Sequence, residues 1–369
     1  MMTQLDVVET SGRGSSTDGP EYYVRGRDMR VVAFAIACFS VAACSAQDAR
    51  SVERAKSATW KDTSLHKTLA VKVETNVELE VLDWGGSGRP IVLLAGLGMT
   101  AHVFDAFAEK LAGPFHVYGI TRRGYGASSR PTSGYSEERL AEDDLRAFDE
   151  LKLVAPVVAG HSIAGNELSQ LGIHHFGRIG GLVYLDALND GTDDYTDYDE
   201  LSAKLPDVMR RPPQPEASER ESFAAYGAWL RRTESITMPE AELRAEFAEN
   251  PDGSVGSFRT PGYVPQAIIA GDHKHDYSQI RVPVLAFVGY PNLPQEQIRR
   301  NHVTDRAERT TVEAAYGVYV GMARNRIKRI AAAAGGARTV DLWGANHLVF
   351  LSNETDVLRE MRVFLAGLP

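Results

Sequence analysis

The chain has 369 residues, of which 43% are hydrophobic and 24% are charged, and its formal net charge is -9. This length suits one large domain with an insertion, and the absence of repeats and low-complexity tracts argues against a solenoid or a disordered chain. The acidic balance argues against a nucleic-acid partner, because binding to a duplex requires a concentrated basic surface.

The N-terminus contains a segment typical of an export signal. Residues 31–46 are uncharged and apolar, Arg25, Arg27 and Arg30 precede them, and small residues close the segment. Such a run is short for a membrane span. We therefore expect residues 1–46 to be an N-terminal extension with an export signal, and the protein to be periplasmic, secreted or lipid-anchored. A buried helix or a bilayer anchor is the alternative.

Two processing routes fit this segment. One is cleavage after Ala46, and the other is lipidation at Cys44, because residues 41–44 (Val-Ala-Ala-Cys) resemble a lipobox. Membrane contact is expected only through the signal or through such a lipid. Both cysteines, Cys38 and Cys44, lie inside the segment. A mature domain would then have no thiol, which excludes disulfides, cysteine nucleophiles and thiolate metal sites.

An α/β domain is predicted after a short linker. Residues 47–66 are charged and are expected to have little order, and the first part of the core is expected at 67–188. Residues 69–73 and 77–82 show period-two features on either side of a turn, which predicts a hairpin. The continuous apolar run at 91–95 predicts a strand that is buried on both faces.

Strands and helices then alternate along the chain. The predicted strands lie at 115–120, 154–159 and 179–185, and the predicted helices lie near 104–111, 140–151 and 163–175. This alternation predicts a mostly parallel sheet that is covered by helices on both faces.

The pattern changes at residues 189–280, which are charged, rich in proline and helix-like, with no strong strand. Because the segment is too long for a structureless loop, we predict a helical cap inserted over the strand ends. The second part of the core is expected at 281–369. Its predicted elements are a strand at 282–288, a helix at 311–334, a strand at 338–343 and a helix at 356–365.

The strongest chemical motif is Gly-His-Ser-Ile-Ala-Gly at residues 160–165, between a predicted strand and a predicted helix. A serine at the tip of such a turn exposes its hydroxyl, and its neighbours two positions away must be small so that strand and helix can approach. The alternative is that Ser162 only caps the helix.

Three further motifs follow predicted strands. Leu-Ala-Gly-Leu-Gly occupies residues 94–98, Arg-Gly-Tyr-Gly-Ala-Ser occupies 123–128, and Gly-Ala-Asn-His-Leu occupies 344–348. The alternative interpretation of the first motif is a glycine turn without a catalytic role. For the last motif, the alternative is that His347 only caps a helix or packs.

Together these motifs resemble the α/β-hydrolase fold family, from about Thr68 to the C-terminus. The resemblance implies that Ser162 is the nucleophile and His347 the general base, and that the backbone N–H groups of Leu97 and Ile163 form an oxyanion hole. Residues 123–128 are then architectural. The chain departs from the family pattern in having Ala164 for a glycine, Ala95 for a histidine and Thr121 for an aspartate.

The sequence identifies the catalytic acid less directly than it identifies Ser162 and His347. Relatives place an aspartate after the strand at 282–288, in the pattern Gly-x-x-Asp, but this chain has Asn292 there. An asparagine cannot supply the charge that stabilises an imidazolium. Some members use a position that corresponds to Asp186, at the end of the preceding strand, so Asp186 is the candidate acid. The order Ser, Asp, His is kept, and an N-capping role for Asp186 is the alternative.

A histidine-rich loop at residues 272–276, Asp-His-Lys-His-Asp, raises the question of a metal site. Loop residues of mixed charge at a junction between cap and core explain it as well. We therefore expect no metal and no cofactor.

The resemblance implies a serine hydrolase, with carboxylic esters of small molecules as the expected substrates. A serine nucleophile disfavours the dehalogenase and epoxide hydrolase branches, which use aspartate. A lactonase, an amidase or a carbon-carbon bond hydrolase uses the same machinery, and a non-catalytic binding protein is the alternative from another class. The sequence gives no indication of the oligomeric state.

Overall fold

The computed structural model describes residues 60–188, 193–211 and 213–369. The expected export signal, both cysteines and most of the expected linker lie outside these residues. No helix among the described residues is long and apolar enough to span a bilayer.

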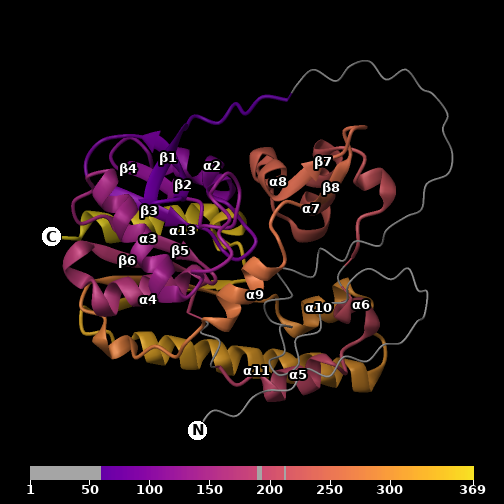
Figure 1. Cartoon of the computed structure of the whole chain (residues 1–369). Coiled ribbons are helices and arrows are strands. Elements are labelled where there is room, and N and C mark those ends of the chain that lie inside the picture. The colour runs from indigo at the N-terminus through magenta and orange to yellow at the C-terminus, as the bar shows by residue number, and fades with distance from the viewer. Residues whose placement is uncertain (1–59, 189–192, 212) are drawn as a thin grey trace, which may run out of the picture. The chain divides into compact units, whose positions relative to one another are not determined.

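An eight-stranded sheet forms the centre of the domain (Figure 1), in the order β1-β2-β4-β3-β5-β6-β9-β10. β1 pairs antiparallel with β2, and β2 with β4, whereas all other neighbours are parallel. The strands are β1 (Lys67–Glu74), β2 (Val77–Gly85), β3 (Pro90–Leu94), β4 (His116–Ile120), β5 (Val157–His161), β6 (Gly181–Leu185), β9 (Val284–Tyr290) and β10 (Ala337–Trp343). The predicted opening hairpin and mostly parallel sheet are confirmed.

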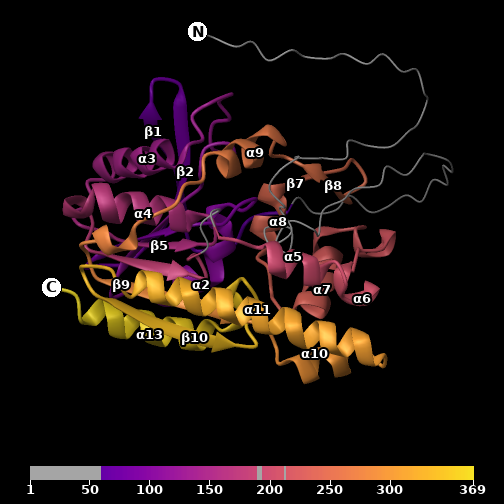
Figure 2. The ribbon, with the colours of Figure 1, turned by 90° about the horizontal axis from the view of Figure 1, so that it is seen from below.

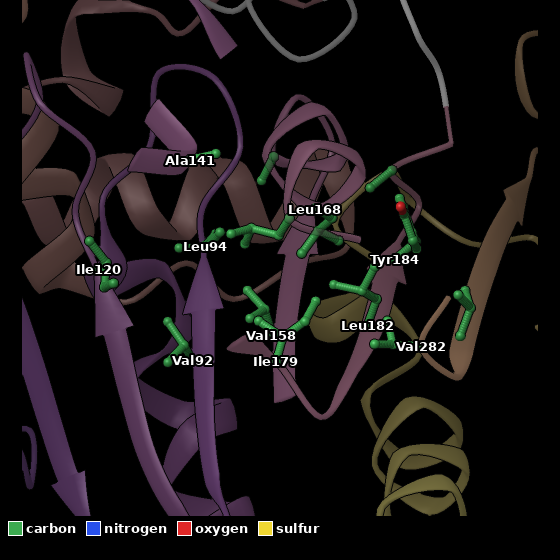
Figure 3. Packing of buried hydrophobic residues seen from close by; sticks show 14 of the residues in the cluster. Val92, Leu94, Ile120, Ala141, Val158, Leu168, Ile179, Leu182, Tyr184 and Val282 are labelled. Carbon is green, nitrogen blue, oxygen red and sulfur yellow. The ribbon is translucent and has the colours of Figure 1, made fainter. Parts of the chain in front are cut away.

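Both faces of this sheet are buried, as the apolar runs predict. In β3, Val92 and Leu94 belong to one hydrophobic cluster, while Ile91 and Leu93 belong to the other. Figure 3 shows the first cluster, in which Leu168 packs over the strands. This cluster includes residues of α3 (Glu137–Glu150), α4 (Ala164–His174) and α11 (Arg306–Ile330), and the second includes residues of α2 (Asp105–Leu111) and α13 (Glu354–Ala366).

Residues 193–279, which lie in the segment predicted to be the cap, contain several short helices. The helices are α5 (Thr196–Ser202), α6 (Asp207–Arg210), α7 (Phe223–Glu234), α8 (Glu240–Glu246) and α9 (Tyr263–Ala270). Figures 1 and 2 show α5 beside α11. The prediction that this region lacks strands is wrong, because β7 (Phe247–Glu249) and β8 (Val255–Phe258) form an antiparallel pair. Their connection contains Gly253 at φ +86°, a turn signal that the helical pattern obscured.

Two other segments differ from expectation. Helix α10 (Pro294–Arg300), with a proline in its first turn, and the short α12 (Val349–Ser352) were not predicted. The last residues before β1 also make contacts that a linker of little order would lack. Trp60 lies 4.9 Å from the guanidinium of Arg244 in the cap, and the backbone N–H of Leu65 donates to Glu109.

Candidate active site

Ser162 lies at a tight turn between β5 and α4, in the left-handed region at φ +55°. Few residues with a side chain adopt this conformation, and such strain is found where a turn is fixed by its surroundings. A Cβ on Gly160 would lie 2.9 Å from that of Ala164, and a Cβ on Gly165 would overlap the carbonyl oxygen of Ala187. The small residues of the motif therefore allow the strand and the helix to meet at Ser162.

Three predicted residues come together at this turn. The Oγ of Ser162 lies 2.9 Å from Nε2 of His347, and Nδ1 of His347 lies 2.7 Å from Oδ2 of Asp186. Because a carboxylate can only accept, Nδ1 carries the hydrogen and donates to Asp186. Nε2 is then the acceptor that faces the serine hydroxyl.

Asp186 follows directly after β6 and is held by its neighbours. Its Oδ1 accepts from the backbone N–H of Gly289 at 2.9 Å, and its own backbone is left-handed at φ +51°. A Cβ on Gly289 would lie 3.1 Å from Oδ2 of Asp186, so glycine leaves room for the carboxylate. Both oxygens of Asp186 are thus bonded to β9 and His347 rather than capping a helix.

Asn292, at the more usual acid position, lies elsewhere in the same region. A Cβ on Gly344 would lie 2.8 Å from Oδ1 of Asn292, which places this amide beside the start of the loop that carries His347. The backbone oxygen of Asn292 accepts from Gln297 in α10. His347 thus donates its Nδ1 hydrogen to Asp186.

The loop at residues 94–98 approaches Ser162 closely. A Cβ on Gly96 would lie 3.3 Å from Cβ of Ser162 and 2.6 Å from Nδ1 of His161, so the approach requires glycine. Leu97 follows at once, and Leu97 and Ile163 are both buried. The segment that carries Leu97 therefore lies close to Ser162, and Ile163 is the residue that follows Ser162 in the chain.

A buried ion pair that the sequence analysis missed supports both segments. Arg122, after β4, donates through Nε and Nη2 to the carboxylate of Glu167 in α4, at 2.8 and 2.5 Å. Its Nη2 also donates to the carbonyl of Ala95 at 3.1 Å. The consecutive arginines after β4 were the available signal, but a pairing with a residue 45 positions away is not readable from the sequence.

His161, next to the serine, lies against His347. Its Nε2–H donates to the backbone oxygen of His347 at 3.1 Å, and the two rings are 4.6 Å apart. Burial, together with the nearby charge of His347, holds the pKa of His161 well below its usual range. This imidazole is therefore neutral, and its role is to fix the backbone of His347.

The histidine-rich loop at 272–276 is tied into the surrounding structure. Asp272 accepts from Asn166, and Asp276 caps a short 3-10 helix (Tyr277–Gln279). His273 and His275 both face the buried carboxylate of Glu137, at 3.2 and 3.3 Å. These contacts tie the loop to α3 and α4.

A model of the Alpha/beta hydrolase family matches residues 91–360. Among curated relatives, epoxide hydrolase A of Mycobacterium tuberculosis is 27% identical over 198 residues, which is 52% of this chain and 55% of that protein. Non-heme chloroperoxidase CPO-A1 of Kitasatospora aureofaciens is 30% identical over 114 residues, covering 30% and 41%. These matches thus span about half or less of the relatives.

Solved structures show the same fold over more of the chain. The structure of E-2-(acetamidomethylene)succinate hydrolase superposes with a TM-score of 0.58 at 17% identity. It covers 82% of this chain and 100% of that chain. At this identity the likeness concerns the fold alone.

Proposed function

Because this chain belongs to the α/β-hydrolase family, we propose that it is a serine hydrolase that cleaves carboxylic esters of small molecules through an acyl-enzyme on Ser162. The observation that carries the proposal is the continuous set of hydrogen bonds from Ser162 through His347 to Asp186. If these hydrogen bonds were only structural, Ser162 would not need to occupy a strained turn beside the loop at residues 94–98.

The proposed reaction has two steps. His347 takes the proton of the Ser162 hydroxyl as its oxygen attacks the ester carbonyl, and the same proton goes to the leaving alkoxide. The N–H groups of Leu97 and Ile163 donate to the oxyanion, and each such donor is typically worth about 10²–10³ in rate. Water then attacks the acyl-enzyme as His347 takes its proton, and His347 passes that proton to the Ser162 oxygen when the acid is released.

Asp186 has an electrostatic role in this scheme. It accepts from Nδ1 of His347 and so fixes the tautomer in which Nε2 is basic, and its charge stabilises the imidazolium that forms. A serine at the turn argues against the chemistry of the epoxide hydrolase relative, which proceeds through an aspartate in that branch. The rival of a non-catalytic binding protein loses its main support, since a carboxylate does reach His347.

The test is labelling with a fluorophosphonate, followed by turnover of p-nitrophenyl esters of increasing acyl length. Stoichiometric labelling at Ser162, identified by peptide mass spectrometry, together with ester turnover, would support the proposal. An unlabelled, folded protein would indicate a binding protein instead. If Ser162 is labelled and the protein turns over lactones or amides but no ester, Ser162 is the nucleophile and the substrates belong to one of those classes instead.

We also propose that the protein is exported, on the basis of the apolar segment at residues 31–46 and the arginines before it. Intact-mass and N-terminal analysis of the protein from a secreting host tests the proposal. Cleavage after Ala46 would leave Gln47 first, and a lipoprotein route would leave an acylated Cys44. Recovery of only the unprocessed chain from the cytoplasm would refute the export proposal.

A further inference from the structure

Two histidines and two aspartates gather away from the serine, and we call them the His/Asp cluster: Asp62, His66, His102 and Asp105. They come from two segments, the residues just before β1 and the short 3-10 helix η2 (Ala101–Phe104) with the first residue of α2. One ligand atom from each of the four lies within 4.8 Å of the others. The cluster is thus compact enough to surround one ion.

Several separations within the cluster already resemble those between the ligands of one ion. His102 Nδ1 lies 3.3 Å from Oδ2 of Asp105 and 3.7 Å from Oδ2 of Asp62, and His66 Nε2 lies 3.6 Å from the same Asp62 oxygen. In a tetrahedral site with bonds of about 2.0–2.1 Å, neighbouring ligand atoms are about 3.3 Å apart. An ion would therefore need only small side-chain shifts.

Both aspartates have one oxygen held by protein donors while the other faces the histidines. Oδ1 of Asp62 accepts from the backbone N–H of Ser64 at 2.9 Å. Oδ1 of Asp105 accepts from Nε1 of Trp84 at 3.1 Å and from Nδ1 of His66 at 2.8 Å. Such outer hydrogen bonds are typical of metal-binding carboxylates, because they orient the oxygen that binds.

His102 has a corresponding outer partner. Its Nε2 lies 3.7 Å from Oε1 of the buried Glu80, while its Nδ1 faces the two aspartates. A carboxylate on the far nitrogen of a ligating histidine fixes its tautomer and increases its basicity. Among the described residues, the recorded ion-pair partners of Asp62, Asp105 and Glu80 are all histidines. Three negative charges thus meet with no lysine or arginine among those partners.

We infer that the His/Asp cluster binds one divalent transition-metal ion, with zinc the best fit. Two imidazole nitrogens and two carboxylate oxygens suit zinc, whereas calcium and magnesium prefer oxygen ligands throughout. Since the protein supplies four ligands, the site is closed and structural. The ion fastens residues 60–66 to the start of α2, and Asp62, whose side chain is 27% exposed, lies on the entry path.

Binding is tested on the full chain without a histidine tag, after EDTA treatment and dialysis. Titration with ZnCl₂ in a calorimeter is expected to show one equivalent of tight binding. Titration with Co²⁺ is expected to give the visible absorption bands of a tetrahedral complex. At a zinc concentration a hundredfold above Kd, the Tm should rise by roughly 5 °C. Absence of binding at about 100 μM metal overturns the inference and leaves a set of hydrogen-bonded ion pairs.

Variants locate the ion. His66→Gln and Asp62→Asn should each weaken zinc binding by at least about a hundredfold, and Asp62 is exposed enough that its variant should fold if the buried His66 variant does not. The matched control is His273→Gln, in a second group of potential ligands with Glu137 and Glu138. The control and the Cys38→Ser, Cys44→Ser double variant should bind as the wild type does. Loss of binding in either control, with retention in His66→Gln and Asp62→Asn, would refute the assignment.

Discussion

The proposed catalytic site and the His/Asp cluster use the same side chains for opposite purposes. In the first, one carboxylate lies on Nδ1 of His347 and a neutral hydroxyl lies on Nε2. In the second, carboxylates lie on both nitrogens of His66 and of His102. Carboxylates near both nitrogens of His102 favour its positively charged form, whereas a general base must be able to accept a proton.

The pKa of His102 illustrates the difference. Desolvation disfavours its charged form, but the hydrogen bond to Asp105 and the nearby carboxylate of Glu80 outweigh the burial and raise the pKa of His102 to about 10. With no ion bound, a proton supplies the positive charge. An imidazole that is already protonated at neutral pH cannot accept a proton from a substrate, so His102 is unsuited to act as a general base.

Replacing Ser162 by alanine removes the proposed nucleophile and is expected to have the largest effect. Turnover of p-nitrophenyl esters should fall by about 10⁶, because loss of a serine protease nucleophile has a comparable effect. The Tm should stay nearly unchanged, since little packing is lost. Activity within about tenfold of wild type in a folded variant would show that Ser162 is not the nucleophile.

Asp186→Asn removes the charge and keeps the shape. We expect kcat to fall at least about a hundredfold, with most of the loss persisting at saturating substrate, because the tautomer and the imidazolium both lose support. Circular dichroism should first confirm folding. A folded variant with wild-type kcat would mean that the comparison above is wrong and that His347 acts without a carboxylate.

Glu242 and Glu246 form a third acidic group, in which two carboxyl groups lie together and neither is hydrogen-bonded to a histidine among the described residues. Glu242 in α8 accepts from the N–H and hydroxyl of Thr100, and Glu246 is hydrogen-bonded to Glu242. Burial raises the pKa of Glu242 to about 7, and burial together with Glu242 raises that of Glu246 well above its usual range. These contacts join the cap to the loop after Leu97.

Both pKa values are raised on folding, so this stabilisation is complete below about pH 4.5 and is lost as the pH rises through the raised pKa of each group, which is about 7 for Glu242. Between pH 5 and 8 the free energy of unfolding should fall by on the order of 3 kcal/mol from Glu242, with a further fall from Glu246. Glu246→Gln should reduce that fall, whereas the exposed control Glu221→Gln should not. The free energy of unfolding is measured with urea at the two pH values above for the wild type and both variants. An equal pH dependence in all three proteins would contradict the prediction.

Asn292→Ala should have the smallest effect, a change in kcat within about threefold. Its amide lies beside Gly344 and His347 is bonded to Asp186, so no proposed catalytic contact is lost. The measurement is the steady-state kcat of Asn292→Ala, of Asp186→Asn and of the wild type under the same conditions. A loss as large as that of Asp186→Asn would show that both positions support His347.

The sequence predicted the elements best where periodicity was long and buried. The all-buried strands β5 and β6 and the turn at Ser162 follow from apolar runs and small residues that only one arrangement accommodates. The His/Asp cluster was missed, although Asp62 with His66 and His102 with Asp105 have helical spacings. The two pairs are separated by 36 residues or more and meet only through tertiary packing. The hairpin β7–β8 was missed because its strands are too short to show period two.

The choice of Asp186 over position 292 also has a consequence for engineering. The segment after β9 contains α10, and Arg300 at its end donates to the carbonyl of Thr233 in α7 of the cap. If the acid is Asp186, directly after β6, this segment has no catalytic role and can vary in length and sequence. Loop grafting between β9 and α11 should therefore leave the hydrogen bonds of Ser162, His347 and Asp186 intact, which makes this connection tolerant of replacement.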